Sequence, residues 1–136
     1  MKSKIEIAWA SGVIEGEGSI IANLNGRSKF NGEPYLRCQL RVCMTDKDII
    51  QKLQAVFGVG IVAEYNNLSR LGKKPIWRWD VRRALEAKVV CELIYPYMGQ
   101  RRKKQIEHLF EQIVLHPPIS NHERNIRMWI TRKKNK

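Results

Sequence analysis

The sequence predicts an α+β fold, in which four strands form one antiparallel sheet and helices cover one of its faces. The 136 residues include 43% hydrophobic residues and four tryptophans, which suffices for one compact domain with its own core. Apolar residues recur at helical spacing in some segments and alternate with polar residues in others, in the order α-β-β-α-β-β-α. Two hairpins separated by a helix are typical of α+β proteins. We expect a single domain over residues 1–136, with further helices at its C-terminal end and a basic helix and tail at 120–136.

The chain begins with a helix followed by a strand. Residues 4–15 have helical spacing, because hydrophobic residues recur every four positions at Ile5, Trp9 and Val13. Gly16 and Gly18 are expected to end this helix. Residues 19–25 then predict a short strand, and the polar, turn-rich residues 26–34 predict a connection.

Residues 35–45 give the clearest strand signal in the chain. Their apolar side chains alternate with a second set that forms the opposite face, namely Arg37, Gln39, Arg41 and Cys43. Arginine and glutamine side chains have the forked geometry that suits hydrogen bonding to base edges. The same alternation also fits an ordinary solvated face.

The second half of the chain repeats the pattern of a helix and two strands. Thr45, with Asp48 three residues later, forms a variant capping box for a helix that ends at Gly58. Residues 61–65 and 75–81 predict two more strands. In the second of these, Trp77, Trp79 and Val81 are expected to face inward, and Ile76, Arg78 and Asp80 to face outward.

Three helices complete the predicted fold. Residues 83–95 carry an apolar stripe of Leu85, Val89, Val90, Leu93 and Ile94, and Pro96 ends the helix. Residues 100–115 carry a stripe of Ile106, Leu109, Phe110 and Ile113. Ser120 with Glu123 predicts the cap of a last, basic helix.

The charge of the chain indicates a polyanionic partner. There are 25 Lys and Arg against 13 Asp and Glu, a net charge of +12. Such an excess favours nucleic acid or an acidic membrane surface. Every long apolar run is interrupted by charge, so we expect no membrane span and prefer nucleic acid. Three cysteines without a pairing or zinc pattern fit an intracellular, reducing compartment, so we expect a protein that is not secreted.

The first helix has unusually small side chains and ends at an acid between glycines. Ala8, Ser11, Gly12 and Glu15 are expected to share one side of the helix with Gly16. Small residues at this spacing allow two helices to approach closely, either two copies of this helix or two helices of one chain. Glu17 lies at the negative end of the helix dipole, so a cation is expected near it.

Residues 10–18, ASGVIEGEG, resemble position by position the LAGLIDADG motif of homing endonucleases. The element order of the whole chain also resembles that of this family. Because only one copy of the motif is present, the chain resembles the homodimeric members. The resemblance implies a site-specific endonuclease that hydrolyses phosphodiester bonds of double-stranded DNA, genomic, organellar or from phage, at a long, roughly palindromic target. It implies Mg²⁺ as cofactor, with Mn²⁺ or Ca²⁺ able to occupy the site.

The resemblance also assigns roles to residues near the motif. Glu17 is the implied catalytic metal ligand, the Gly16 carbonyl lies near the metal, and Glu15 serves helix termination and the dimer interface, with Ala8, Ser11 and Gly12. Arg102, three positions before a glutamine, is the implied cation for the scissile phosphate, with Lys103 or Lys104 after a one-residue shift. Asp46 is the implied water-ordering residue, although it also suits the first turn of a helix. The basic run also fits a helix end that contacts phosphates nonspecifically.

DNA contacts are expected from the outward-facing strand residues and the connection after the first strand: Ile21, Asn23, Asn25, Arg27, Arg37, Gln39, Arg41, Arg78 and Asp80. One rival function is binding without cleavage, as an intron RNA maturase or a sequence-specific DNA-binding protein on the same fold. A basic protein that coats nucleic acid is the other rival. The acid at position 17 favours an enzyme, because a protein that only binds has no need of it.

Overall fold

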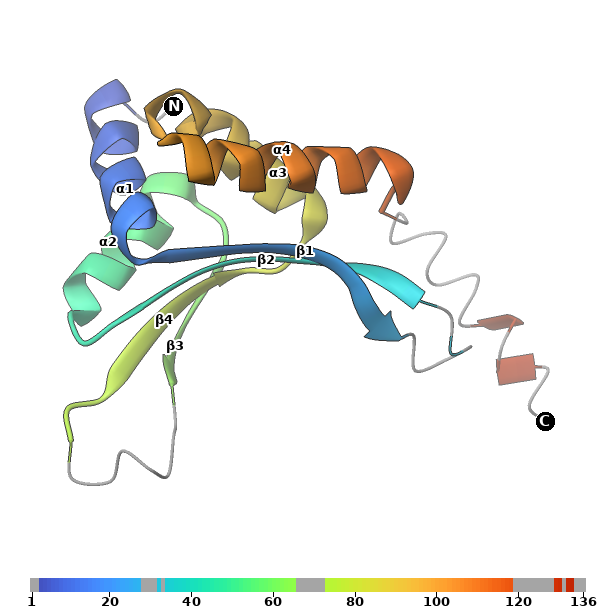
Figure 1. Cartoon of the computed structure of the whole chain (residues 1–136). Helices are drawn as coiled ribbons and strands as arrows, with labels where there is room; N and C mark the ends of the chain where they lie inside the picture. The colour runs from blue at the N-terminus through green and yellow to red at the C-terminus, as the bar shows by residue number, and fades with distance from the viewer. Residues whose placement is uncertain are drawn as a thin grey trace.

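Four strands form one sheet, and four α-helices lie on one side of it (Figure 1). The computed structural model describes residues 3–27, 32, 34–65, 73–118, 129–130 and 132–133. The elements are α1 Lys4–Glu17, β1 Gly18–Arg27, β2 Pro34–Met44, α2 Lys47–Phe57, β3 Ile61–Tyr65, β4 Ile76–Val81, α3 Ala84–Ile94, the 3-10 turn η2 Tyr95–Tyr97 and α4 Gln100–Leu115. The predicted α+β class and element order are confirmed. The expected cap of the last basic helix, Ser120 with Glu123, lies outside the described residues.

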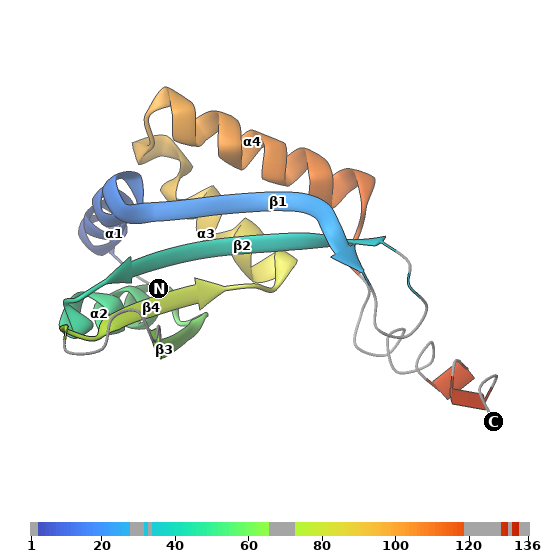
Figure 2. The same cartoon turned by 60° about the horizontal axis from the view of Figure 1, so that its bottom comes forward.

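The sheet is antiparallel throughout, in the order β1-β2-β4-β3. Figure 2 shows the four strands side by side with the helices behind them. Leu40 pairs with Ile20 on one side and Val81 on the other, so these apolar residues share the face that meets the helices. Arg41 pairs with Ser19 and Asp80, and its row forms part of the opposite face.

The core lies between this sheet and the helices. Its largest fully buried side chains include Ile14 of α1, Leu40 of β2 and Trp79 of β4. The Trp79 ring stacks on Phe57 of α2 at a centroid distance of 5.5 Å, and its indole N–H donates to the Val59 carbonyl at 2.9 Å. The buried ring therefore keeps its one polar group satisfied while it joins β4 to α2.

Helix α1 runs directly into strand β1. The helix continues through Gly16 and Glu17, two residues past the predicted end, and Gly18 is already extended with φ −82° and ψ 161°. A Cβ at Gly18 would lie 2.5 Å from the Ile14 carbonyl oxygen. The glycine is therefore required for this close approach of strand to helix rather than for a left-handed turn.

The predicted start of α2 was wrong. Helix α2 begins at Lys47, and its N-cap is Asp46, which makes no side-chain capping hydrogen bond. Thr45 therefore forms no capping box with Asp48, because it lies one residue before the cap. The predicted end is confirmed, since Gly58 has φ 70° and lies in the left-handed region.

The apolar stripe predicted for α3 was wrong in part. Val90 and Ile94 are buried as expected, but their neighbours in the core are Ala87 and Cys91. Leu85, Val89 and Leu93 form an exposed row one helical face away. The buried side of α3 thus includes two small residues, Ala87 and Cys91, and three larger side chains remain exposed. For α4 the prediction is confirmed, with Ile106, Leu109 and Ile113 buried and Phe110 packed against the core.

The three cysteines are free, as expected from their spacing. Cys38 and Cys91 are buried, and burial raises the pKa of Cys91 to about 12. Within the described ranges, no helix combines the length and apolar character needed to cross a membrane.

Candidate functional site

The acid of the motif lies exposed at the junction of α1 and β1. Glu17 is the last residue of the helix, and Gly16 before it is also exposed. Since Gly18 pairs with Val42, β2 leaves the sheet at the end where β1 begins. Asp46, which follows β2, is exposed at the start of α2 and so belongs to the same end of the sheet.

Arg102 of α4 contacts the C-terminal end of α1. Its side chain is only 5% exposed, and its guanidinium donates to the backbone carbonyls of Glu15, at 3.4 Å, and Gly18. A cation at this position satisfies carbonyls that the helix leaves unpaired and opposes the negative end of its dipole. Burial lowers the pKa of Arg102, as does the charge of Arg101, while the Glu15 carboxylate opposes the shift.

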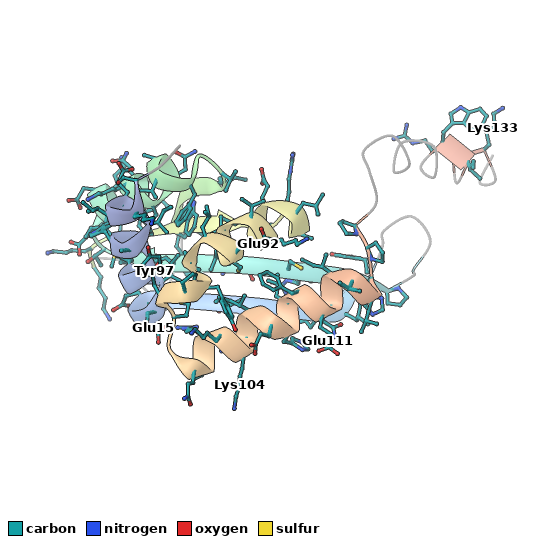
Figure 3. All side chains as sticks on the ribbon, turned by 90° about the horizontal axis from the view of Figure 1, so that it is seen from above. Glu15, Glu92, Tyr97, Lys104, Glu111 and Lys133 are labelled. Atoms are coloured by element: carbon teal, nitrogen blue, oxygen red, sulfur yellow. The ribbon has the colours of Figure 1, made fainter. Side chains whose placement is uncertain are left out.

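Glu15 makes the reciprocal contact with the N-terminal end of α4. Gly99 is the N-cap of α4, and a Cβ at this position would lie 2.7 Å from Glu15 Oε1. The carboxylate therefore lies at the positive end of the α4 dipole. Figure 3 shows Glu15 at the end of α1, beside the segment that leads into α4. We call these contacts of Glu15 and Arg102 the α1–α4 clamp. Within it, Glu15 Oε2 and Arg102 Nε are buried and have no hydrogen-bond partner among the described residues.

The remaining basic residues of this helix start have different surroundings. Lys103 lies with its ammonium 5.2 Å from the centre of the Tyr95 ring, in cation–π geometry. Arg101 and Lys104 are exposed. The structure thus brings Arg102 to the backbone beside Glu17, and places Lys103 against an aromatic ring of η2.

The small residues of α1 do not all share one face. Ala8, Gly12 and Gly16 are exposed, whereas Ser11 is 1% exposed and donates its hydroxyl to the Ile7 carbonyl at 2.7 Å. Ser11 therefore belongs to the core side of the helix, contrary to prediction. Apart from the neighbouring backbone of α1 itself, no atom of the described residues lies within 4 Å of a Cβ built on Gly12 or Gly16, so packing among the described residues does not require these glycines.

The polar face of the sheet holds a buried carboxylate. Asp80 is 4% exposed, and Arg41 binds it with two nitrogens, Nε to Oδ1 at 2.6 Å and Nη2 to Oδ2 at 3.2 Å. Arg78 and Arg82 lie 3.3 Å and 3.4 Å from Oδ2. Gln39 donates to Oδ1 at 3.3 Å and accepts from Arg37 at 3.2 Å. We call these residues the Asp80 cluster: Arg37, Gln39, Arg41, Arg78, Asp80 and Arg82.

The cluster sets the ionisation of its members. Burial alone would raise the pKa of Asp80, but hydrogen bonds from Arg41 and Gln39 outweigh it and hold this pKa below its ordinary value. The hydrogen bond to Asp80 likewise raises the pKa of Arg41. Both groups are therefore charged at neutral pH.

Most of the predicted DNA-contacting residues do share this face. Ile21 pairs with Gln39, and Asn23 pairs with Arg37. Asn25 and Arg27 belong to β1 by their backbone, and their side chains lie outside the described part. Gln39 is only 3% exposed, so its amide is used within the chain. Sequence reasoning missed Arg82, although it continues the alternation of Arg78 and Asp80 past the end of β4.

A metal site is present at most in part. No group of three or more His, Cys, Asp or Glu side chains is placed to hold a metal ion in the described part of the chain. Glu17 offers one exposed carboxylate, a hard oxygen ligand of the kind that Mg²⁺ accepts together with water. The described residues therefore supply one ligand suited to a divalent metal ion at this position, the Glu17 carboxylate.

Several solved structures of homing endonucleases match the fold of this chain. The complex of I-CvuI with its DNA target matches with a TM-score of 0.67 and 21% identity, over 79% of this chain and 65% of that chain. I-CeuI in complex with DNA matches with a TM-score of 0.59 and 15% identity, over 82% and 55% of the two chains. I-TnaI matches over 100% of both chains, with a TM-score of 0.56 and 17% identity.

Sequence comparison adds no further relative: no protein-family model matches the chain, and no curated protein matches it. The chain spans just under two thirds of the I-CvuI chain that it matches. The structural neighbours also include a LAGLIDADG meganuclease, I-CpaMI, bound to uncleaved DNA. The resemblance first seen in residues 10–18 thus extends to the whole arrangement of helices and strands, and the chain has the fold of the LAGLIDADG homing endonucleases.

Proposed function

We propose that this protein is a metal-dependent, site-specific DNA endonuclease. The observation that carries the proposal is the exposed Glu17 carboxylate at the end of the sheet whose polar face bears the Asp80 cluster. The same sheet thus has a carboxylate suited to catalysis at one end and a cationic surface suited to a polyanion on its polar face. The net charge of +12 supports the same partner.

The sheet supplies the surface for recognition. Arg41 and Arg78 are partly exposed, so the guanidinium N–H groups that do not bind Asp80 remain available for base edges or phosphates. Arg37 and Arg82 extend this surface along the two neighbouring strands. Antiparallel strands of this kind fit the major groove of DNA.

Glu17 and its neighbours supply the residues for hydrolysis. Glu17 would hold the divalent ion, with the Gly16 carbonyl nearby, and a bound Mg²⁺ would supply Lewis-acid activation of water and of the phosphate. Arg102 fixes the last turn of α1, from which the Glu17 side chain projects. Asp46 is free of a capping bond and can accept a hydrogen bond from a water molecule at this end of the sheet.

Each protomer supplies half of the site. The exposed Ala8, Gly12 and Gly16 face of α1 suits close packing against a second copy, because these glycines have no packing role within the chain. A twofold contact through α1 would bring two Glu17 side chains near the symmetry axis. Such a dimer calls for a roughly palindromic target.

The structural neighbours support this proposal. I-CvuI was solved on its own DNA target in the presence of Ca and, in a second complex, on the I-CreI target in the presence of Mg with the DNA not cleaved, so these complexes support DNA binding with a divalent ion present. I-CeuI, which is group I intron-encoded, was also solved with DNA. By analogy, we propose that this chain acts on a long DNA site of its host element.

Replacing Glu17 tests the function. In a digest of a genomic DNA library with Mg²⁺, followed by sequencing of the ends, the unaltered protein is expected to produce recurrent cleavage sites. Glu17→Gln should retain its affinity for those sites and lose cleavage by roughly 100-fold or more, since the charge that holds the metal is gone. Glu111→Gln, an exposed acid of α4, is the matched control and should cleave normally.

Three outcomes would decide against parts of the proposal. Normal cleavage by Glu17→Gln would remove Glu17 from the mechanism. Specific binding of DNA without cleavage by the unaltered protein would favour a sequence-specific binding protein. Preferential binding of structured RNA would favour a maturase.

A further inference from the structure

Asp80 is too deeply buried to contact a DNA base. It belongs to a row of four paired residues that crosses the sheet, Ser19, Arg41, Asp80 and Ile61. Although this row lies on the polar face, Asp80 is almost fully buried, because the side chains of the Asp80 cluster cover it. A carboxylate that touches so little solvent has little surface left for DNA.

The acceptor capacity of Asp80 is already used. A carboxylate offers about four lone-pair sites. Oδ1 accepts from Arg41 and Gln39, while Oδ2 accepts from Arg41 and Arg82 and has Arg78 at 3.3 Å. A contact with the exocyclic amine of a cytosine would require one of these bonds to break. Asp80 therefore acts on the protein rather than on a base.

Asp80 restrains three like charges that would otherwise separate. One carboxylate binds Arg41, Arg78 and Arg82. The contact with Arg41 is bidentate, which fixes the plane of its guanidinium. The restraint leaves the remaining N–H groups of Arg41 and Arg78 with defined directions. Pre-organised donors of this kind favour one pattern of base-edge acceptors over another.

We propose that Asp80 is a positioning residue that aims the arginines of the sheet, and that it sets sequence discrimination at the expense of general DNA affinity. The inference rests on the proposed DNA function. It follows from two opposite effects of one carboxylate: its geometry orders the arginines, while its charge repels phosphates. A residue that only stabilised the fold would support both binding to preferred sequences and binding to DNA of any sequence.

Two substitutions separate charge from geometry. Asp80→Asn removes the negative charge and one acceptor, which frees the arginines. Asp80→Glu keeps the charge but moves the carboxylate outward by one methylene, so the arginines keep a counterion in a changed position. Glu111→Gln changes the net charge by the same amount as Asp80→Asn, at an exposed position on α4 far in sequence from the cluster. Circular dichroism and thermal melts are used to check that each variant is folded at the assay temperature.

Each full-length variant is given a randomised DNA duplex library, and the bound duplexes are sequenced. Affinity for the unselected library is measured in a salt titration. Asp80→Asn should lower the enrichment of preferred bases by about tenfold at the affected positions. It should also bind the unselected library more tightly, with a salt slope steeper by about 0.9 for each guanidinium that gains a phosphate. Asp80→Glu should lose enrichment with an unchanged salt slope, and Glu111→Gln should keep the enrichment of the unaltered protein.

The outcomes distinguish this inference from the proposed function. Unchanged enrichment by Asp80→Asn would overturn the inference alone, as would a folded Asp80→Asn variant with weaker binding to the unselected library. If the unaltered protein showed no salt-dependent binding to duplex DNA, the proposed function would fail, and the inference with it.

Discussion

Single side chains in this protein take their roles from charged neighbours. Gln39 and Asp80 are polar residues of an open sheet face, yet both are buried, because arginines extend over them. Arg102 has the opposite character, a cation that is buried against backbone carbonyls. In each case the partner, rather than the residue type, decides whether a side chain is available to a ligand.

The lowered pKa of Asp80 predicts a pH-dependent contribution to stability. A carboxyl with a lowered pKa in the folded state stabilises the protein above its ordinary value of 3.8, and this contribution is lost as the pH falls through the folded pKa. Asp80→Asn should therefore reduce the free energy of unfolding by about 1–3 kcal/mol at neutral pH, since its partners remain partly exposed. The difference should shrink below pH 3.8.

Urea unfolding over a pH series checks this expectation. Glu111→Gln serves as the control with the same change in net charge, and its stability should follow that of the unaltered protein throughout. A difference for Asp80→Asn that stayed constant down to strongly acidic pH would show that ionised Asp80 does not stabilise the fold.

At the residue scale, the sequence predicts faces better than contacts. Alternation in residues 35–45 and 75–81 placed Arg37, Arg41 and Asp80 on one face, and the sheet register confirms this. The register itself follows from the packing of the whole sheet. That Arg41 lies opposite Asp80, and that Gln39 is thereby buried, could not be read from either strand alone.

Two helix ends of this fold are joined by charged residues. The C-terminal end of α1 and the N-terminal end of α4 meet in the α1–α4 clamp, where each helix supplies the charge that the other lacks. Glu15 and Arg102 are far apart in the sequence, so their contact fixes the junction at Glu17 through tertiary structure. Local geometry adds to this, because Gly18 packs directly on Ile14.

Arg102→Met should destabilise the protein by about 1–3 kcal/mol, because it removes the hydrogen bonds that the partly buried guanidinium donates to the carbonyls of Glu15 and Gly18. Arg102→Lys should recover part of the loss, since it keeps the charge but cannot reproduce the paired hydrogen bonds. Thermal unfolding measures both. Arg101→Met, which removes an exposed charge from the same turn, is the control and should leave the midpoint nearly unchanged. Equal midpoints for the Arg101 and Arg102 variants would show that the clamp contributes nothing.

Periodicity predicts elements well where one stripe dominates. The stripe of α4 is unambiguous, and its buried residues match the prediction. In α3 apolar residues occupy several positions around the helix, so the pattern alone does not determine which side meets the sheet. Tertiary packing buries Ala87 and Cys91, and Leu85 and Val89 remain exposed. The cap of α2 was missed for a similar reason, since Thr45 and Asp46 are both acceptable cap residues in sequence.

In the described part of the chain, two of the exposed surfaces differ in their chemistry. One is the arginine-bearing face of the sheet, and the other is the exposed small-residue side of α1. The alternation in residues 35–45 and 75–81 predicted the first, and the spacing of small residues predicted most of the second. The sequence could not show that Ser11 faces inward, because its hydroxyl is satisfied by the Ile7 carbonyl within the same helix.

Gly12→Leu tests the α1 surface as a dimer interface. The protomer has room for the new side chain, and leucine favours helix more than glycine does, so the fold should be retained. Two helices could then no longer approach closely, and light scattering should give a monomer mass at concentrations at which the unaltered protein is a dimer. Ala55→Leu, on the exposed side of α2, is the control and should not change the mass. An unchanged dimer mass for Gly12→Leu would place the interface elsewhere.

Strand β1 follows helix α1 directly, with no loop between Glu17 and Gly18. In a twofold assembly through α1, each recognition strand would be a rigid continuation of the helix at the axis. The distance between the polar sheet faces of the two protomers would then be fixed. Such a protein would tolerate exchanged bases in its target far better than an inserted or deleted base pair between the two halves.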